Sequence, residues 1–138
     1  MMNLFGGICK LGIVAGAFGA IATFLWGGAD EYLYALLAFV GADLLSGVIA
    51  ARITNTASSR KLINGFFRKL LYFVAVSDAS ILDYHVLDAG GTIRNFCVVY
   101  LISGEGLSIL ENCGRCGLPI PPKLLAALEQ LKDNKGGK

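Results

Sequence analysis

The sequence is poor in charged residues and in the side chains on which most enzyme sites depend. Lys, Arg, Asp and Glu together make up 16% of its 138 residues, and there is one histidine. Hydrophobic residues make up 55%, which is high for a soluble domain of this length. They occur in blocks with the charges gathered between the blocks, rather than alternating with polar residues. The composition therefore predicts one small membrane domain over residues 1–138.

Several kinds of site are excluded by what is missing. The four cysteines are spaced too unevenly for the disulfide framework of a small secreted protein. They are Cys9, Cys97, Cys113 and Cys116. His85 lies near Asp83 and Asp88 in the sequence. One histidine and two carboxylates are weak evidence for a metal site, and a polar helix end is the simpler interpretation. Basic residues do not alternate with aromatic ones, so nucleic acid is not an expected partner. We predict no enzymatic activity and no cofactor.

One pair of cysteines has a spacing that is found in redox and zinc sites. Cys113 and Cys116 are separated by Gly-Arg. Structural zinc usually takes four nitrogen or sulfur ligands, and the chain has no second pair. The pair is therefore a weak metal candidate, open only if copies of the chain share their thiols, and a chance spacing is the simpler interpretation.

Four apolar stretches are long enough to cross a bilayer. They are 11–29, 32–51, 70–87 and 95–110. The first contains no charged residue, and about nineteen helical residues extend roughly 28 Å, close to the ~30 Å hydrocarbon core. The third contains Asp78 and Asp83, and the fourth, at about sixteen residues, is near the lower limit. We predict an all-α polytopic membrane protein with four transmembrane helices.

Small residues recur at helical spacing within the first of these stretches. Gly12, Gly16 and Ala20 follow one another every four residues, and Ala15 and Gly19 form a second ridge. Smooth ridges allow close backbone contact between membrane helices, and Gly47 is a further small residue of this kind in the second stretch. The ridges predict helix packing, although membrane helices are often rich in glycine for no specific reason.

Positive charges fall on one side of the predicted membrane. A loop at 52–69 has no acidic residue and carries five cations that could also contact anionic lipid, at about 1 kcal/mol per close charge. These are Arg52, Arg60, Lys61, Arg68 and Lys69. Lys10 lies on the same side, as do the C-terminal cations Arg115, Lys123, Lys132, Lys135 and Lys138. Only Arg94 falls on the opposite side, with Asp30, Glu31 and Asp88. The positive-inside rule then predicts four crossings with both termini in the cytoplasm.

The chain after the fourth stretch predicts a short amphipathic helix over 122–132. Pro119, Pro121 and Pro122 interrupt the preceding segment, and proline suits a first helical turn. Leu124, Leu125, Leu128 and Leu131 then share one face. Such a helix can lie on the inner leaflet, join its copies in a bundle or pack against the basic loop.

Carboxylates within the predicted spans are the principal functional candidates. Asp43, Asp78 and Glu105 lie inside spans, and Asp83 and Glu111 lie near span ends. An ionisable group near the bilayer centre costs about 2.5–3.5 kcal/mol on insertion scales. We expect no cation inside the spans, so salt bridges are not expected to neutralise them. They can line a water-filled lumen, form a proton relay, or hydrogen-bond between helices while protonated.

The C-terminal third of the sequence resembles a known family. The segments that carry the resemblance are Glu105-Gly106-Leu107-Ser108-Ile109-Leu110-Glu111-Asn112, then Gly117-Leu118-Pro119-Ile120-Pro121, and Ala127-Leu128-Glu129-Gln130-Leu131-Lys132. They resemble the holins of Gram-positive phages and the clostridial toxin-secretion holins. The glycine-rich first stretch, Asp43, the basic loop and Asp83 fit less specifically. Asp78, the cysteine pair and arginine in place of lysine in the loop depart from the family pattern.

The resemblance implies a protein that accumulates in the bacterial cytoplasmic membrane and forms homo-oligomers. Pores or lesions then release an endolysin or a toxin, and the host cell lyses. Two alternatives remain open from the sequence. A small four-helix transporter of ions or small molecules would leave the membrane potential intact, and an antiholin-like partner would be harmless alone but would change the lysis timing of another pore former.

Overall fold

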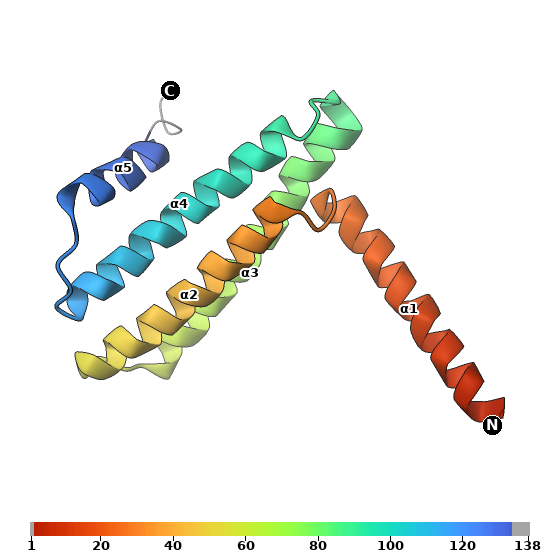
Figure 1. Cartoon of the computed structure of the whole chain (residues 1–138), viewed down its shortest axis with the longest axis horizontal. Helices are drawn as coiled ribbons and strands as arrows, with labels where there is room; N and C mark the ends of the chain where they lie inside the picture. Colours follow the sequence, from red (N-terminus) through yellow and green to blue (C-terminus); the bar gives the residue numbers. More distant parts are fainter. Residues whose placement is uncertain (1, 134–138) are drawn as a thin grey trace.

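The computed structural model describes residues 2–133, and over these residues the chain is helical and contains no strand (Figure 1). The expected all-α class is therefore confirmed for this part. The helices are α1 (Met2–Trp26), α2 (Glu31–Ile53), α3 (Ser59–Ile81), the π-helix η1 (Leu82–Leu87), α4 (Thr92–Arg115) and α5 (Pro122–Asp133). Lys135 and Lys138 of the expected basic tail lie outside the described residues.

Helices α2, α3 and α4 form a bundle around a small apolar core (Figure 1). Leu36 and Val40 of α2 meet Val76 of α3 and Val98 and Leu101 of α4, and all five are buried. Most other large apolar side chains of these helices face outward. A soluble bundle would have to cover them, whereas lipid accommodates them, so the exposed apolar surface agrees with a membrane protein.

Helix α1 diverges from this bundle, and the start of α1 lies far from the other helices (Figure 1). Its end is fixed to α3, where the Trp26 Nε1 donates a hydrogen bond of 3.1 Å to the Phe73 carbonyl. Every side chain from residue 10 to residue 21 is exposed. A Cβ added at Gly12, Gly16 or Gly19 would meet no atom within 4 Å. The small-residue ridges, with Ala15 and Ala20, thus have no packing partner among the described residues, and their role in helix association stays a prediction.

Three helical segments are long and apolar enough to cross a membrane. They are Glu31–Ile53, Ser59–Leu87 and Thr92–Arg115. The apolar helix Lys10–Trp26 is shorter than these three. The expectation of four crossings is therefore not confirmed by length and composition.

The prediction of a basic loop over 52–69 is wrong. The α2–α3 connection is short, because α2 continues to Ile53 and α3 begins at Ser59 after an extended N-cap, Ser58. Four of the five cations assigned to the loop, Arg60, Lys61, Arg68 and Lys69, therefore lie on α3. The basic segment is compatible with a helix, because Arg and Lys are good helix formers and the segment contains no proline.

Helix α4 is longer than expected, whereas α5 begins at the expected residue. Helix α4 has 24 residues instead of about sixteen, because it continues through polar residues until Gly117 adopts a left-handed φ of +85°. Helix α5 begins at Pro122, where the amphipathic helix 122–132 was expected, and it contacts α4 (Figure 1). A Cβ on Gly114 of α4 would lie 3.8 Å from the Ile120 side chain in the α4–α5 connection.

Candidate functional site

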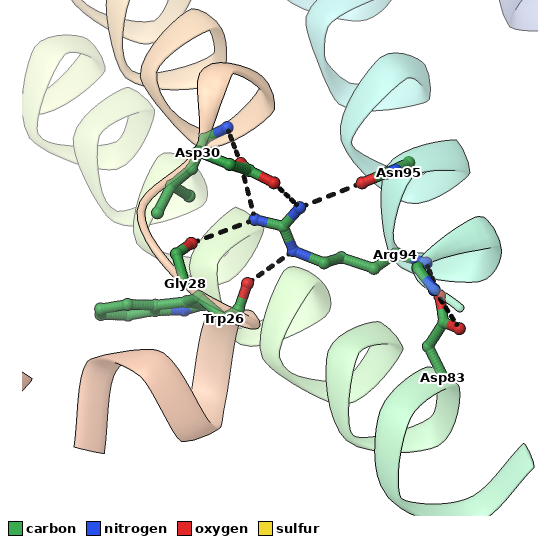
Figure 2. A network of polar contacts seen from close by, with 8 residues as sticks. Trp26, Gly28, Asp30, Asp83, Arg94 and Asn95 are labelled. Atoms are coloured by element: carbon green, nitrogen blue, oxygen red, sulfur yellow. Dashed lines mark hydrogen bonds and ion pairs between the residues drawn. The ribbon is translucent and has the colours of Figure 1, made fainter. Parts of the chain in front are cut away.

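One buried cluster, the Arg94 joint, ties the α1–α2 turn to the start of α4. Arg94 is fully buried and uses all five of its guanidinium N–H donors (Figure 2). Its Nη1 and Nη2 bind the two Asp30 carboxylate oxygens at 2.6 and 3.0 Å. The Nε donates to the Trp26 carbonyl at 2.5 Å, Nη2 to the Gly28 carbonyl at 3.4 Å, and Nη1 to Asn95 Oδ1 at 3.0 Å. One cation therefore satisfies a carboxylate, the carbonyl at the end of α1 and a carbonyl in the following turn.

Local backbone geometry explains why the joint forms at this turn. Asp30 is the N-cap of α2 and accepts a hydrogen bond from the Leu33 N–H at 3.0 Å. The hydrogen bonds from Arg94 hold the pKa of Asp30 below its ordinary value of 3.8. Gly27 has φ +72°, and a Cβ there would lie 2.6 Å from Tyr84 Cε2. Only glycine fits this backbone position without displacing Tyr84.

Asp83, expected as an intramembrane candidate, completes the joint from the other side. It is fully buried, and its carboxylate accepts hydrogen bonds from the Gly91 and Arg94 backbone N–H groups at 2.9 and 2.7 Å (Figure 2). These N–H groups belong to the start of α4, which has no side-chain cap of its own from Gly91. Asp83 thus supplies the negative charge that a helix N-terminus favours.

A second buried cluster, the Lys69 cluster, joins α2, α3 and α4. Its members are Lys69, Asp43, Glu105, Asn112 and Ser46. The Lys69 Nζ forms ion pairs with Asp43, at 2.8 Å, and with Glu105. Asn112 Nδ2 donates to Asp43 Oδ1 at 3.2 Å and to Ser46 Oγ at 3.0 Å. The expectation that no cation lies among the intramembrane carboxylates is therefore wrong, since Lys69 is on the helix and is only 7% exposed.

The Lys69 cluster borders a polar cavity of about 220 Å³. Its lining residues are Asp43, Gly65, Arg68, Lys69, Tyr72, Glu105 and Ser108. When Asp43, Glu105 and Lys69 are all ionised, the three side chains carry one excess negative charge. Such a charge is stable in a low-dielectric interior only with further hydrogen bonds, a proton or water. The Arg94 joint also has two carboxylates for one cation, but its second carboxylate, Asp83, accepts hydrogen bonds from two backbone N–H groups at the start of α4. Among the described residues, no backbone N–H group bonds to the Glu105 carboxylate of the Lys69 cluster in this way.

The remaining acidic candidates lie on the surface of the chain. Asp78 of α3 and Glu111 of α4 are exposed. Within the described residues, the Asp78 carboxylate makes no hydrogen bond or ion pair. The structure therefore brings Asp43 and Glu105 together, places Asp83 in the Arg94 joint, and leaves Asp78 and Glu111 apart from both clusters.

Two of the other predicted site residues border the Lys69 cluster, since Arg68 lines its cavity and Gly47 faces Asn112. The rest are separate from both clusters. Arg52, Arg60, Lys61 and Arg68 are exposed, so their contact with lipid headgroups stays a prediction. A Cβ on Gly47 would lie 3.6 Å from Asn112 Nδ2, so this glycine faces α4. His85 is exposed and stacks on Phe24, with ring centroids 4.6 Å apart. The described residues contain no group of three or more His, Cys, Asp or Glu that could hold a metal, which leaves Cys113 and Cys116 as a pair.

The sequence did not identify Arg94 as a site residue, and it predicted lipid contact for Lys69, which instead forms buried ion pairs with Asp43 and Glu105. The opposite charges of Asp30 and Arg94, assigned to the same side of the membrane, were a signal for the first pair. No comparable signal identifies Lys69, because the basic residues at the start of α3 are typical of a loop as well as of a helix.

The protein has long apolar helices with charged groups buried between them, and this arrangement is that of a helical membrane protein. The sequence model of the bacteriophage holin family matches residues 20–133, and the chain belongs to this family. An uncharacterized 14.9 kDa protein of Clostridium perfringens is 39% identical over 127 residues, covering 91% of this chain and 94% of that protein. YqxH of Bacillus subtilis is 38% identical over 113 residues, covering 82% and 79%.

A phage protein is also similar to this chain. The protein named "Probable holin" of Bacillus phage phi105 is 32% identical over 111 residues, covering 80% of this chain and 82% of that protein. No solved structure matches significantly.

Proposed function

We propose that this protein is a holin that oligomerises in the bacterial cytoplasmic membrane and opens lesions through which an endolysin or a toxin leaves the cell, leading to lysis. The observation that carries the proposal is the family match over residues 20–133, with the phage relative named "Probable holin" in support. The role requires no catalytic chemistry and no cofactor. It requires a chain that is inserted in lipid and can then associate around water.

The proposed topology has four crossings, with α1 as the fourth and both termini in the cytoplasm. The segment Lys10–Trp26 would extend about 26 Å as a helix, slightly less than the ~30 Å hydrocarbon core. Lys10 and the exposed cations of the α2–α3 region fall on one side, while Asp30, Glu31 and Asp88 fall on the other. Arg94, the cation on the acidic side, is neutralised by Asp30. This distribution follows the positive-inside rule.

The proposed driving force for lesion opening comes from carboxylates that the single chain does not neutralise. Asp78 is exposed within a helical segment of 29 residues that is long enough to span the membrane. A carboxylate facing lipid is costly, so Asp78 favours an arrangement in which this face of α3 meets water or another copy of the chain. Asp43 and Glu105 add the excess negative charge of the Lys69 cluster. In the proposed assembly, these three carboxylates face a water-filled lumen.

Inducible expression in bacteria, with and without a co-expressed cytoplasmic endolysin, tests the function. Membrane potential and culture density are followed through time. We expect abrupt depolarisation after a delay in both cultures, and lysis only in the culture with endolysin. Normal growth with an intact potential, at a membrane level of protein confirmed by immunoblot, would contradict the proposal.

A further inference from the structure

Two cysteines lie at the cytoplasmic end of α4 in the proposed topology. Cys113 is in the last turn of the helix, and Cys116 is its C-cap, with φ −82° and ψ 0°. Both are half-buried free thiols. Cα atoms three residues apart on a helix lie about 5 Å from each other. This separation is within the ~4.4–6.8 Å range found across disulfides.

Both cysteines face the same space. They line a cavity of about 380 Å³ together with Ser46, Ile49 and Ile53 of α2, and with Asn112 and Leu118. A small thiol-reactive molecule in this cavity would therefore meet both residues, rather than one on each side of the helix.

The end of α4 can accept the local change that a disulfide requires. Side chains three residues apart on a helix have Cβ atoms about 5–6 Å apart, whereas a disulfide brings them to ~3.5–4.5 Å. The backbone beyond Cys116 is already leaving the helix, since Gly117 has φ +85° and the Leu118 N–H bonds back to the Cys113 carbonyl at 3.1 Å. Because α4 ends at Arg115, tightening its last turn does not disturb a helix that continues beyond Cys116.

A metal is a poorer match for this pair than a disulfide. Structural zinc takes four ligands, and within the described residues no third His, Cys, Asp or Glu joins Cys113 and Cys116. Two thiols without further ligands are suited to two-electron thiol chemistry.

The geometry points to a reversible Cys113–Cys116 disulfide, formed by exchange with a low-molecular-weight disulfide of the cytoplasm. The thiolate of one cysteine attacks the small disulfide and expels one small thiolate, which leaves a mixed disulfide. The thiolate of the second cysteine then attacks the protein sulfur and expels the other small thiolate. The cysteine pair loses two electrons, the small disulfide gains them, and the two thiol protons end on the two small thiols.

The disulfide would also reach the Lys69 cluster through the neighbouring residue. Asn112 precedes Cys113 and donates hydrogen bonds to Asp43 and Ser46. A ring closed at Cys113 restricts the last turn of α4 and so favours the conformation in which these hydrogen bonds form. Oxidation should therefore delay lesion opening, a consequence that rests on the proposed holin function.

A tryptic digest of the full-length protein tests the disulfide itself. Membranes that contain a Cys9→Ser, Cys97→Ser variant are equilibrated with mixtures of reduced and oxidised glutathione, and free thiols are alkylated. Trypsin then cleaves after Arg115, between the two cysteines. We expect two peptides joined by a disulfide in the oxidising mixtures and separated by a reductant. Two alkylated thiols in the most oxidising mixture, or glutathione attached to each cysteine, would overturn the proposal.

Timing of depolarisation tests the consequence. Cells that express the wild-type chain or Cys113→Ser, at equal membrane levels, are treated with a membrane-permeant thiol oxidant. We expect a later onset in oxidised wild-type cells and no shift in Cys113→Ser. Equal shifts in both would reject regulation by this pair. No depolarisation in either, even without oxidant, would reject the holin function, while the digest still decides the disulfide.

Discussion

The two buried clusters differ in how completely their charges are balanced. In the Arg94 joint, the guanidinium meets the Asp30 carboxylate, and its remaining donors meet two backbone carbonyls and an amide oxygen. The second carboxylate of the joint, Asp83, is compensated by two backbone N–H groups. In the Lys69 cluster, one ammonium meets two carboxylates beside a polar cavity. A balanced buried group favours a single arrangement, whereas an unbalanced one favours any arrangement that admits water. The joint is therefore assigned to the fold and the cluster to the change that opens the membrane.

The largest expected effect is the loss of the Arg94 guanidinium. Arg94→Gln leaves Asp30 and the turn carbonyls without their donors and should destabilise the protein by about 3–5 kcal/mol. Arg94→Lys should not restore stability, because an ammonium cannot bind both Asp30 oxygens and the Trp26 carbonyl in the same plane. Unfolding in detergent micelles measures the change, with the exposed Arg60→Gln as the matched control. Equal stability of Arg94→Gln and Arg60→Gln would refute the structural role of the joint.

Removal of the Lys69 ammonium should have a smaller effect, because Asn112 still donates a hydrogen bond to Asp43 and the cluster borders a polar cavity. Lys69→Met should destabilise the chain by about 3 kcal/mol. The double variant Lys69→Met, Glu105→Gln should recover part of this loss, since it removes one of the two unpaired charges. The same unfolding measurement compares the two variants. A double variant less stable than Lys69→Met would argue against an excess of negative charge in the cluster.

Replacement of Gly27 tests the close packing at the Arg94 joint. Gly27→Ala adds a methyl group at φ +72° against Tyr84, so we expect a loss of about 1–3 kcal/mol. Gly12→Ala, in the open part of α1, should change stability by less than about 0.5 kcal/mol. Thermal unfolding of both variants in the same detergent provides the measurement. A Gly27→Ala variant as stable as wild type would contradict the close contact between Gly27 and Tyr84.

The smallest expected effect is the dependence of the Arg94 joint on pH. Because the pKa of Asp30 is lowered on folding, its ion pair stabilises the protein above the ordinary value of 3.8. That contribution is lost as the pH falls through the lowered pKa. The difference in unfolding free energy between wild type and Asp30→Asn should therefore be constant near neutral pH and shrink below about pH 4. A constant difference down to the most acidic pH would contradict the assignment.

The long apolar stretches made the helices predictable. Which charged side chains are buried could not be predicted, because their burial depends on where each helix begins and ends. The α2 bounds came close, because an acidic turn before the span and a polar turn after it give clear ends. The start of α3 was missed, because basic residues continue a helix as readily as they form a loop. Since Lys69 was placed in that loop, its pairing with Asp43 and Glu105 could not be expected. For Arg94, the sequence predicted only the side of the membrane on which it lies, and that does not determine whether its side chain is buried.

The onset of depolarisation in matched amide variants is the most direct test of the central claim that unneutralised carboxylates drive lesion opening. Asp78→Asn and Glu105→Gln should each delay onset at unchanged membrane levels, because each removes a charge that favours an arrangement around water. Asp88→Asn is the control, since it removes an exposed charge in a turn whose φ of +47° asparagine tolerates. The account predicts delays for the first two variants and none for the control. Wild-type timing in Asp78→Asn and Glu105→Gln would contradict it.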